Sequence, residues 1–386
     1  MEPQRDQGRH TWGICPFRFA QLLLFLILLV TCLSPEGRAA ARTDDPQPGG
    51  LPTRQPARAG HSREAHNALP RTPAAVIYQP AVQGMINQVS SAQLYNLVSG
   101  LSGETPLTIG GEAVTLVTRY SESAYYTGKA TQYAYEYFQA LGLPVTYQNY
   151  SAEGMNLRNV IAEQAGQNSG CIYMLTAHID DTSQTPNTYA PGADDNASGA
   201  AGVLTAAGIL KNYRFTCTLR YALFTGEEHG LYGSDYYASE AKDRGDPILG
   251  VLNLDMIAYN TPGSEATIEI DVRPGSEGTA DKVISSELAG VLQAYSIPLT
   301  PYLYETNEGG SDQDSFWYAG YPAVLAIEDW DDHTPDYHKT TDRLSTLNMP
   351  FFTDFVRLAV GTTAHLAQWV STGAGNKSYL PLTSRY

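Results

Sequence analysis

Positive charge is scarce in this sequence. Its 386 residues include 24 Lys and Arg against 40 Asp and Glu, which gives a formal net charge of −16. It contains no stripe of basic side chains with interleaved aromatic residues. This balance argues against nucleic acid or an anionic membrane surface as a partner. The length is nevertheless sufficient for one large domain with a sizeable core.

Long apolar runs are also rare, and the one near the N-terminus has the features of a targeting signal. Arginines precede the apolar run 22–33, which is short for a membrane span, and small residues at 39–41 offer a cleavage site. Residues 1–41 are therefore predicted to be a secretory signal peptide, with an uncleaved anchor as the alternative. We expect a secreted, extracellular protein that touches a membrane only if that anchor is retained.

Cysteine is scarce as well, with four in the chain. Cys15 and Cys32 would leave with the signal peptide, so Cys171 and Cys217 remain, each at the start of a predicted strand. An oxidising compartment permits a disulfide between them. Two buried free thiols in neighbouring strands are the alternative that the sequence leaves open.

Large apolar side chains are nearly absent from residues 42–75, which are rich in Pro, Arg and Gly. Such a segment cannot bury enough surface to offset the entropy of ordering, so it is predicted to be a disordered linker. Residues 373–386 lack a periodic pattern and are predicted to be a flexible tail. A single domain is expected between them, at residues 76–372.

Alternating strand and helix signals fill this domain. Residues 171–177 form a near-continuous apolar run, which is typical of a strand covered on both faces, and 219–225 and 252–254 read similarly. Helices are predicted between these strands, at 198–211 and 231–241. The alternation predicts an α/β fold with a mostly parallel central sheet flanked by helices on both faces. In such sheets ligands bind beyond the carboxyl ends of the strands.

Histidine and carboxylate side chains lie at or just after the ends of these strands and in two loops. The set comprises His178, Asp180, Asp195, Glu227, Glu228, Asp255 and His338. Such a set suits one or two borderline metal ions, zinc first. Each motif alone has an ordinary explanation, such as a helix cap at Asp195, but their recurrence in one domain predicts a metal site. His333 competes with His338 as the last histidine ligand.

The ordered motifs AHID, PGADDNASG, FTGEEHGLYGS, LNLDM, SDQDSFWYAGYPA and DYHKTTD resemble those of the secreted two-zinc aminopeptidases. That family includes bacterial leucyl aminopeptidase and aminopeptidase Y, within the glutamate carboxypeptidase superfamily. The resemblance covers roughly residues 88–370. It implies a zinc exopeptidase fold of the phosphorylase/hydrolase-like type. It further implies a monomeric zinc metallopeptidase that releases N-terminal amino acids from peptides with a free N-terminus, using water activated by two zinc ions.

The resemblance also implies a role for each site residue. The five zinc ligands would be His178 and Asp255 on the first ion, Glu228 and His338 on the second, and Asp195 bridging both. Glu227 would be the general base, and Asp180 would orient His178 from behind. A cis peptide bond after Asp195 is a further family feature.

The resemblance identifies the substrate-binding residues less directly than the zinc ligands. The chain has Ser311-Asp312-Gln313 where the family often has Ser-Asp-His or Ser-Asp-Tyr, so the sequence does not identify the donor to the oxyanion. The predicted substrate-binding residues are Met256, Glu308, Gln313 and Tyr337. Met256 indicates an apolar side-chain site, whereas Glu308 would favour basic residues.

Three other functions stay open at this point. A carboxypeptidase or dipeptidase of the same fold would need basic side chains to hold a terminal carboxylate, and Lys339 is the only Lys or Arg in the ligand-bearing motifs. A one-zinc glutaminyl cyclase would use only part of the ligand set. A non-catalytic binding module would lose ligands or Glu227. The sequence does not distinguish zinc from cobalt or manganese.

Overall fold

The computed structural model describes residues 67–68 and 76–371. The predicted signal peptide, most of the predicted linker and the predicted tail lie outside the described residues. Asn67–Ala68 form a short strand, β1, which pairs antiparallel with β10 (Thr300–Glu305). These two residues lie within segment 42–75, which was predicted to be a linker, and the edge of β10 offers backbone groups to such a passing segment. Among the described helices, none is long and apolar enough to cross a membrane.

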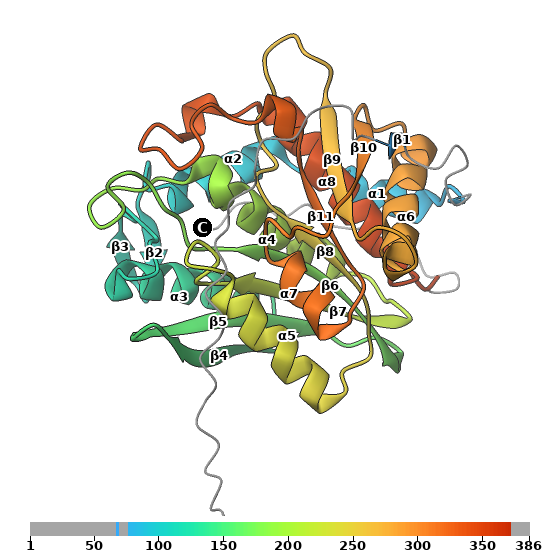
Figure 1. The fold of residues 1–386 in the computed structure, drawn as a ribbon, viewed down its shortest axis with the longest axis horizontal. Coiled ribbons are helices and arrows are strands. Elements are labelled where there is room, and N and C mark those ends of the chain that lie inside the picture. The colour runs from blue at the N-terminus through green and yellow to red at the C-terminus, as the bar shows by residue number, and fades with distance from the viewer. Residues whose placement is uncertain (1–66, 69–75, 372–386) are drawn as a thin grey trace, which may run out of the picture. The chain divides into compact units, whose positions relative to one another are not determined.

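Nine strands form one mixed sheet in the order β1-β10-β9-β11-β8-β6-β7-β5-β4 (Figure 1). The four central strands run parallel: β11 (Ala323–Glu328), β8 (Ile248–Leu254), β6 (Asn168–His178) and β7 (Cys217–Phe224). Antiparallel pairs join β9 (Thr267–Val272) to β11, β5 (Met155–Gln164) to β7, and β4 (Val145–Ala152) to β5. The predicted parallel sheet is confirmed, and its centre consists of the apolar strands that the sequence indicated.

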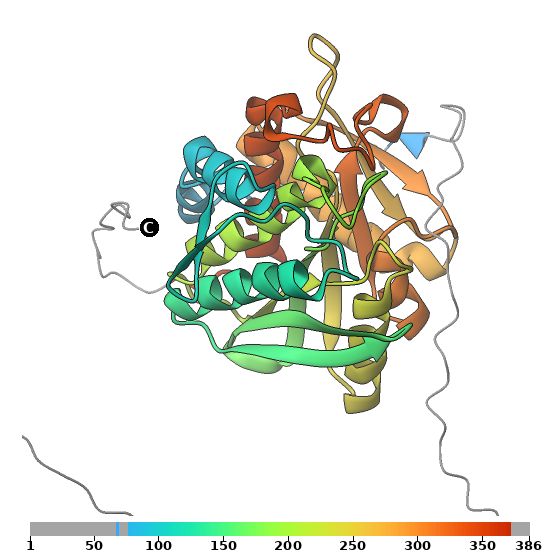
Figure 2. The ribbon, with the colours of Figure 1, turned by 90° about the vertical axis from the view of Figure 1, so that its left-hand side faces the viewer.

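Helices cover both faces of this sheet, as predicted (Figures 1 and 2). One face carries α3 (Ala124–Ala140), α4 (Gly199–Leu210), α6 (Asp281–Tyr295) and α8 (Met349–Leu366). The other carries α5 (Tyr232–Arg244) and α7 (Gln313–Ala319). Two further helices, α1 (Pro80–Ile86) and α2 (Ser91–Leu101), pack against α8, and a small hairpin of β2 (Leu107–Ile109) and β3 (Glu112–Val114) precedes α3. A single domain results.

Local sequence explains several element ends. Ser90 caps α2, because its hydroxyl accepts a hydrogen bond from the backbone N–H of Gln93 at 3.3 Å. α3 stops before Gly142, whose φ of +76° suits a residue without a Cβ. α4 is buried along its whole length, since its many Ala and Gly residues let it pack closely on the sheet.

Cys171 of β6 and Cys217 of β7 form a disulfide, which decides between the two alternatives that the sequence left open. Their Cα atoms lie 5.0 Å apart on neighbouring strands, and 46 residues separate them in the chain. The bond joins the beginnings of the two strands, whereas His178 lies at the opposite end of β6.

Replacing both cysteines with serine should lower the free energy of unfolding by about 2–4 kcal/mol, because the crosslink restricts a long loop in the unfolded chain. Denaturant unfolding of the double variant beside the parent chain measures the difference. Zinc content should not change, since the disulfide lies at the far end of the strands. An unfolding free energy unaffected by the two substitutions would contradict this expectation.

Candidate metal centre and active site

The predicted site residues meet at one edge of the sheet. His178 ends β6, Asp255 follows β8 directly, and Glu227 and Glu228 follow β7 after a two-residue turn. Because β8, β6 and β7 are parallel neighbours, their carboxyl ends share this edge. Asp195 lies in the irregular turn Ala193–Ser198 before α4, and His338 lies in the loop after β11.

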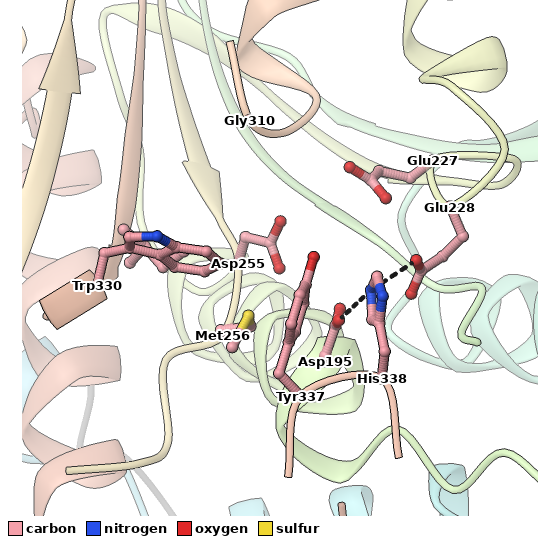
Figure 3. Close-up of a pocket in the computed structure, with 10 residues that line it drawn as sticks. Asp195, Glu227, Glu228, Asp255, Met256, Gly310, Trp330, Tyr337 and His338 are labelled. Carbon is pink, nitrogen blue, oxygen red and sulfur yellow. Dashed lines mark ion pairs between the residues drawn. The ribbon is translucent and has the colours of Figure 1, made fainter. Parts of the chain in front are cut away.

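The histidine and carboxylate side chains form two clusters that share Asp195. In the first cluster, His178 Nε2 lies 3.2 Å from Asp255 Oδ1 and 3.3 Å from Asp195 Oδ1. In the second, His338 Nε2 lies 3.2 Å from Asp195 Oδ2 and 3.0 Å from Glu228 Oε2 (Figure 3). The two oxygens of Asp195 therefore face different histidines.

These separations fit zinc. Zn–N and Zn–O bonds of about 2.0–2.2 Å in a tetrahedral arrangement put neighbouring ligand atoms roughly 3.3–3.6 Å apart. The observed 3.0–3.3 Å between donor atoms is close to this spacing. Burial and the nearby Asp195 also raise the pKa of Glu228 to about 7, as expected for acids gathered without compensating charge. Two cations placed between the donors would relieve that repulsion.

Asp195 is held in place through its backbone. The N–H groups of Asp194 and Asp195 donate to the two carboxylate oxygens of Asp342, at 2.9 and 3.0 Å. Asp194 points away from the clusters, and its Oδ1 accepts a hydrogen bond from Ala258 N at 2.9 Å. The Asp195–Asn196 peptide bond is cis, as the family resemblance implies. Sequence reasoning missed the role of Asp342, although this residue ends the DYHKTTD motif.

Glu227 lies beside the clusters and diverges from its neighbour Glu228 (Figure 3). A carboxylate oxygen of Glu227 lies within 4.8 Å of ligand atoms of His178 and Glu228. Burial, and then the charge of Glu228, raise the pKa of Glu227 well above its usual range. Glu227 lacks the short histidine contact that Glu228 has. A buried carboxylate of this kind beside a metal site is suited to accept and return a proton.

Asp180 lies on the Nδ1 side of His178 and contacts it mainly through its backbone. His178 Nδ1 lies 3.2 Å from the backbone oxygen of Asp180 but 3.7 Å from its carboxylate. The carboxylate instead accepts hydrogen bonds from Ser121 Oγ at 2.8 Å and from Gly226 N at 3.0 Å, with Glu227 N at 3.3 Å. Asp180 therefore orients His178 mainly through its main chain, and its side chain holds the turn that carries Glu227.

A small cavity adjoins the clusters. It is lined by Asp195, Glu227, Glu228, Asp255, Met256, Gly310, Ile327, Trp330, Tyr337 and His338. Met256 and Tyr337 lie there as predicted. Glu308 is exposed in the loop before α7 and Gln313 is fully buried at the start of that helix; neither lines the cavity.

Apolar side chains that the sequence did not single out form one wall of this cavity. Met256, Ile327 and Trp330 belong to one buried cluster, with Tyr337 packed against it. Ile327 lies near the end of β11, at the edge of the sheet where the candidate ligands meet. An apolar residue at that strand end was a sequence signal that could have identified it as part of the cavity wall. Trp330 begins the short 3-10 helix Trp330–Asp332 after β11, and nothing in its local sequence pointed to the cavity.

The competing histidine, His333, is occupied elsewhere. Its ring stacks on Trp330 with the ring centroids 4.5 Å apart, and its Nδ1 lies 2.6 Å from the backbone oxygen of Trp330. His338, in contrast, lies in the second cluster. The geometry therefore favours His338 as the ligand.

His338→Ala should lower the zinc content by about one ion per chain, because it removes the imidazole of the second cluster. His333→Ala should leave the zinc content unchanged. Elemental analysis of both variants after dialysis against a weak chelator measures the two outcomes. Loss of zinc from the His333 variant alone would show that the wrong histidine has been assigned.

Comparisons with known proteins identify the family of this chain. The model of peptidase family M28 matches residues 159–363, which contain all five candidate ligands and Glu227. Leucine aminopeptidase 2 of Trichophyton rubrum is 35% identical over 129 residues, covering 29% of this chain and 25% of the relative. A probable zinc metalloprotease of Pyrenophora teres f. teres is 28% identical over 199 residues, covering 49% and 42%. The chain thus spans less than half the length of these relatives.

Solved structures share the fold. The LapA aminopeptidase of Legionella pneumophila superposes with a TM-score of 0.62 at 19% identity, covering 76% of this chain and 77% of LapA. The glutaminyl cyclase of Fimbriiglobus ruber gives a TM-score of 0.57 at 18% identity, covering 76% and 98%. At such identities the likeness concerns the fold alone. The family match spans more than half of the residues, so this chain belongs to peptidase family M28.

Proposed function

We propose that this chain is a two-zinc aminopeptidase that releases the N-terminal residue of peptides. The observation that carries the proposal is the position of Asp195, whose two oxygens lie 3.3 and 3.2 Å from Nε2 atoms of two different histidines. A carboxylate placed in this way can bridge two ions. A one-zinc glutaminyl cyclase would have no use for the complete first cluster of His178, Asp195 and Asp255.

The lining of the cavity disfavours a substrate held by a terminal carboxylate. None of its ten residues is Lys or Arg, whereas a terminal carboxylate would call for basic side chains. Of its four carboxylates, Asp195, Glu228 and Asp255 are proposed zinc ligands, which leaves Glu227 uncommitted to an ion. The wall of Met256, Ile327 and Trp330 suits an apolar side chain on the first residue. These features support an aminopeptidase over a carboxypeptidase.

The residues around the cavity supply the proton transfers. Zinc held by His178, Asp255, Glu228, His338 and Asp195 would supply an acidified water and a Lewis acid for the scissile carbonyl. Glu227 accepts the proton of the attacking water and delivers it to the departing amine. Tyr337 extends into the cavity beside Asp195 and Asp255 (Figure 3). Burial, and then the charge of Asp195, raise the pKa of Tyr337, so its hydroxyl keeps its proton and can donate to the carbonyl oxygen.

The test is a panel of aminoacyl-anilides with free and N-acetylated amino groups, assayed on the zinc-loaded chain with and without chelator. We expect hydrolysis of free leucyl, methionyl and phenylalanyl compounds, loss of hydrolysis with chelator, and less than about 1% of that rate on acetylated compounds. Equal hydrolysis of blocked compounds would contradict the proposal. Release of ammonia from glutaminyl peptides, without peptide cleavage, would indicate the cyclase instead.

We also propose that the chain is exported and acts as a monomer. The disulfide between Cys171 and Cys217 supports an oxidising compartment. Both clusters are assembled from residues of one chain, so catalysis needs no second subunit. Expression in a secreting host, followed by N-terminal sequencing and light scattering, tests both points. Retention of an uncut chain in the membrane fraction would indicate the anchor alternative.

A further inference from the structure

A completely buried arginine lies behind the metal clusters. Arg119 belongs to the loop between β3 and α3, outside the residues that match the family model. It is the largest of the fully buried side chains in the described part of the chain, with 0% of its surface exposed. Burying a charge of this size is costly unless every donor finds a partner. The hydrogen-bond partners of Arg119 therefore indicate its role in the structure.

The guanidinium group of Arg119 binds backbone oxygens from three separate segments. Nε donates to Ile179 O at 2.8 Å, and Nη1 donates to Leu101 O at 2.6 Å and to Pro191 O at 2.9 Å. Nη2 donates to Gly192 O at 2.9 Å. The charge is balanced by Asp181, whose Oδ2 lies 3.1 Å from Nη1.

Two of these three segments carry candidate ligands of the first cluster, His178 and Asp195. Ile179 directly follows His178, and Gly192 precedes Asp195 by three residues. Gly192 O also accepts a hydrogen bond from Ala197 N at 3.0 Å, so the Asp195 turn is closed on the same carbonyl group. One rigid, planar group thus fixes the distance between the backbone next to His178 and the backbone leading to Asp195.

Two buried side chains hold the Asp195 turn. Arg119 binds the carbonyl oxygens on its N-terminal side, and Asp342 binds the N–H groups of Asp194 and Asp195. The turn is therefore fixed from both sides in the position where Asp195 Oδ1 meets His178. This is how outer-shell partners commonly orient the ligands of a metal.

We infer that Arg119 is a positioning residue for the first zinc ion: its fork of hydrogen bonds sets the separation of His178 and Asp195. The inference rests on the proposed zinc site. A lysine keeps the charge but has a single nitrogen, so it cannot bind the three segments in the same geometry. Asp181→Asn keeps the shape of the partner side chain and removes only its charge, which is a milder disturbance.

The test compares Arg119→Lys and Asp181→Asn with the parent chain. Arg220→Lys is the matched control, because Arg220 is a mostly buried arginine bound to Glu163, Tyr237 and Asp246, away from the clusters. Zinc affinity is measured by competition with a chromophoric chelator. The visible spectrum of the cobalt-substituted chain reports ligand geometry, and thermal unfolding reports stability.

We expect Arg119→Lys to weaken binding of one zinc ion about 10–100-fold and to change the cobalt spectrum, with a smaller effect of Asp181→Asn. Arg220→Lys should lower stability but keep the zinc affinity and spectrum of the parent. If the Arg119→Lys chain keeps the zinc affinity and the cobalt spectrum of the parent, this inference is overturned while the proposed function stands. If the lysine variant does not fold, the same result in the Asp181→Asn chain overturns the inference. A parent chain that binds no zinc would overturn the proposed function and this inference with it.

Discussion

Glu227→Gln should lower kcat by about 10²–10⁴-fold while leaving two zinc ions bound. The amide has the size of the carboxyl group but cannot accept the proton of the attacking water. Glu227 makes no short contact of the kind that joins Glu228 to His338 at 3.0 Å, so its replacement should not disturb the zinc shells. Steady-state kinetics on a leucyl-anilide, together with elemental analysis of the same sample, measures both effects.

The matched control for this variant is Glu287→Gln on α6. Glu287 is a partly buried glutamate whose pKa is also raised by burial, and it faces His365 instead of the clusters. Its replacement should leave kcat and zinc content at parental values. Turnover of the Glu227→Gln chain within a few-fold of the parent, with full zinc, would show that another group accepts the proton.

Asp195→Asn should weaken zinc binding by more than about 100-fold, since loss of even an outer-shell partner commonly costs 10–100-fold. Asp195 offers one oxygen to each cluster, and asparagine has only one oxygen to offer. At least one ion should be lost from the purified chain, and activity should fall with it. Titration of zinc into the apo chain against a chelator gives the affinities.

Asp194→Asn is the matched control, because it changes the adjacent acid of the same turn. Asp194 points away from the clusters toward Ala258 N, and an amide oxygen can keep that hydrogen bond. This variant should retain both zinc ions even where its stability falls. Equal zinc loss from the two variants would mean that Asp195 acts through the fold of the turn and does not bridge two ions.

Much of the sheet could be predicted because its central strands are buried on both faces. β6, β7 and β8 contain near-continuous apolar runs, and they lie where the sequence indicated. β10 was missed, because its half-buried residues show no clear alternation. α7 was also missed, since its seven residues are too few to show a helical period. Its position explains why the side chain of Gln313 is buried in the interior and not in the cavity.

The supporting residues were harder to predict than the candidate ligands. Arginine is seldom fully buried, so nothing in the local sequence marks Arg119 as an interior residue. Its partners are mostly backbone oxygens, which every residue has and no motif encodes. Asp180 shows the same difficulty, since its side chain binds Ser121 and the turn before Glu227.

The sequence by itself determined the fold class, the kinds of donor atom and their positions at strand ends. These properties are local: strand periodicity and side-chain chemistry can be read within a few residues. Only the tertiary structure decided that His338 and not His333 joins Asp195, that the cysteines are bonded, and that the two oxygens of Asp195 face different histidines. Those outcomes are distances between atoms of remote segments, and they depend on how the intervening loops pack.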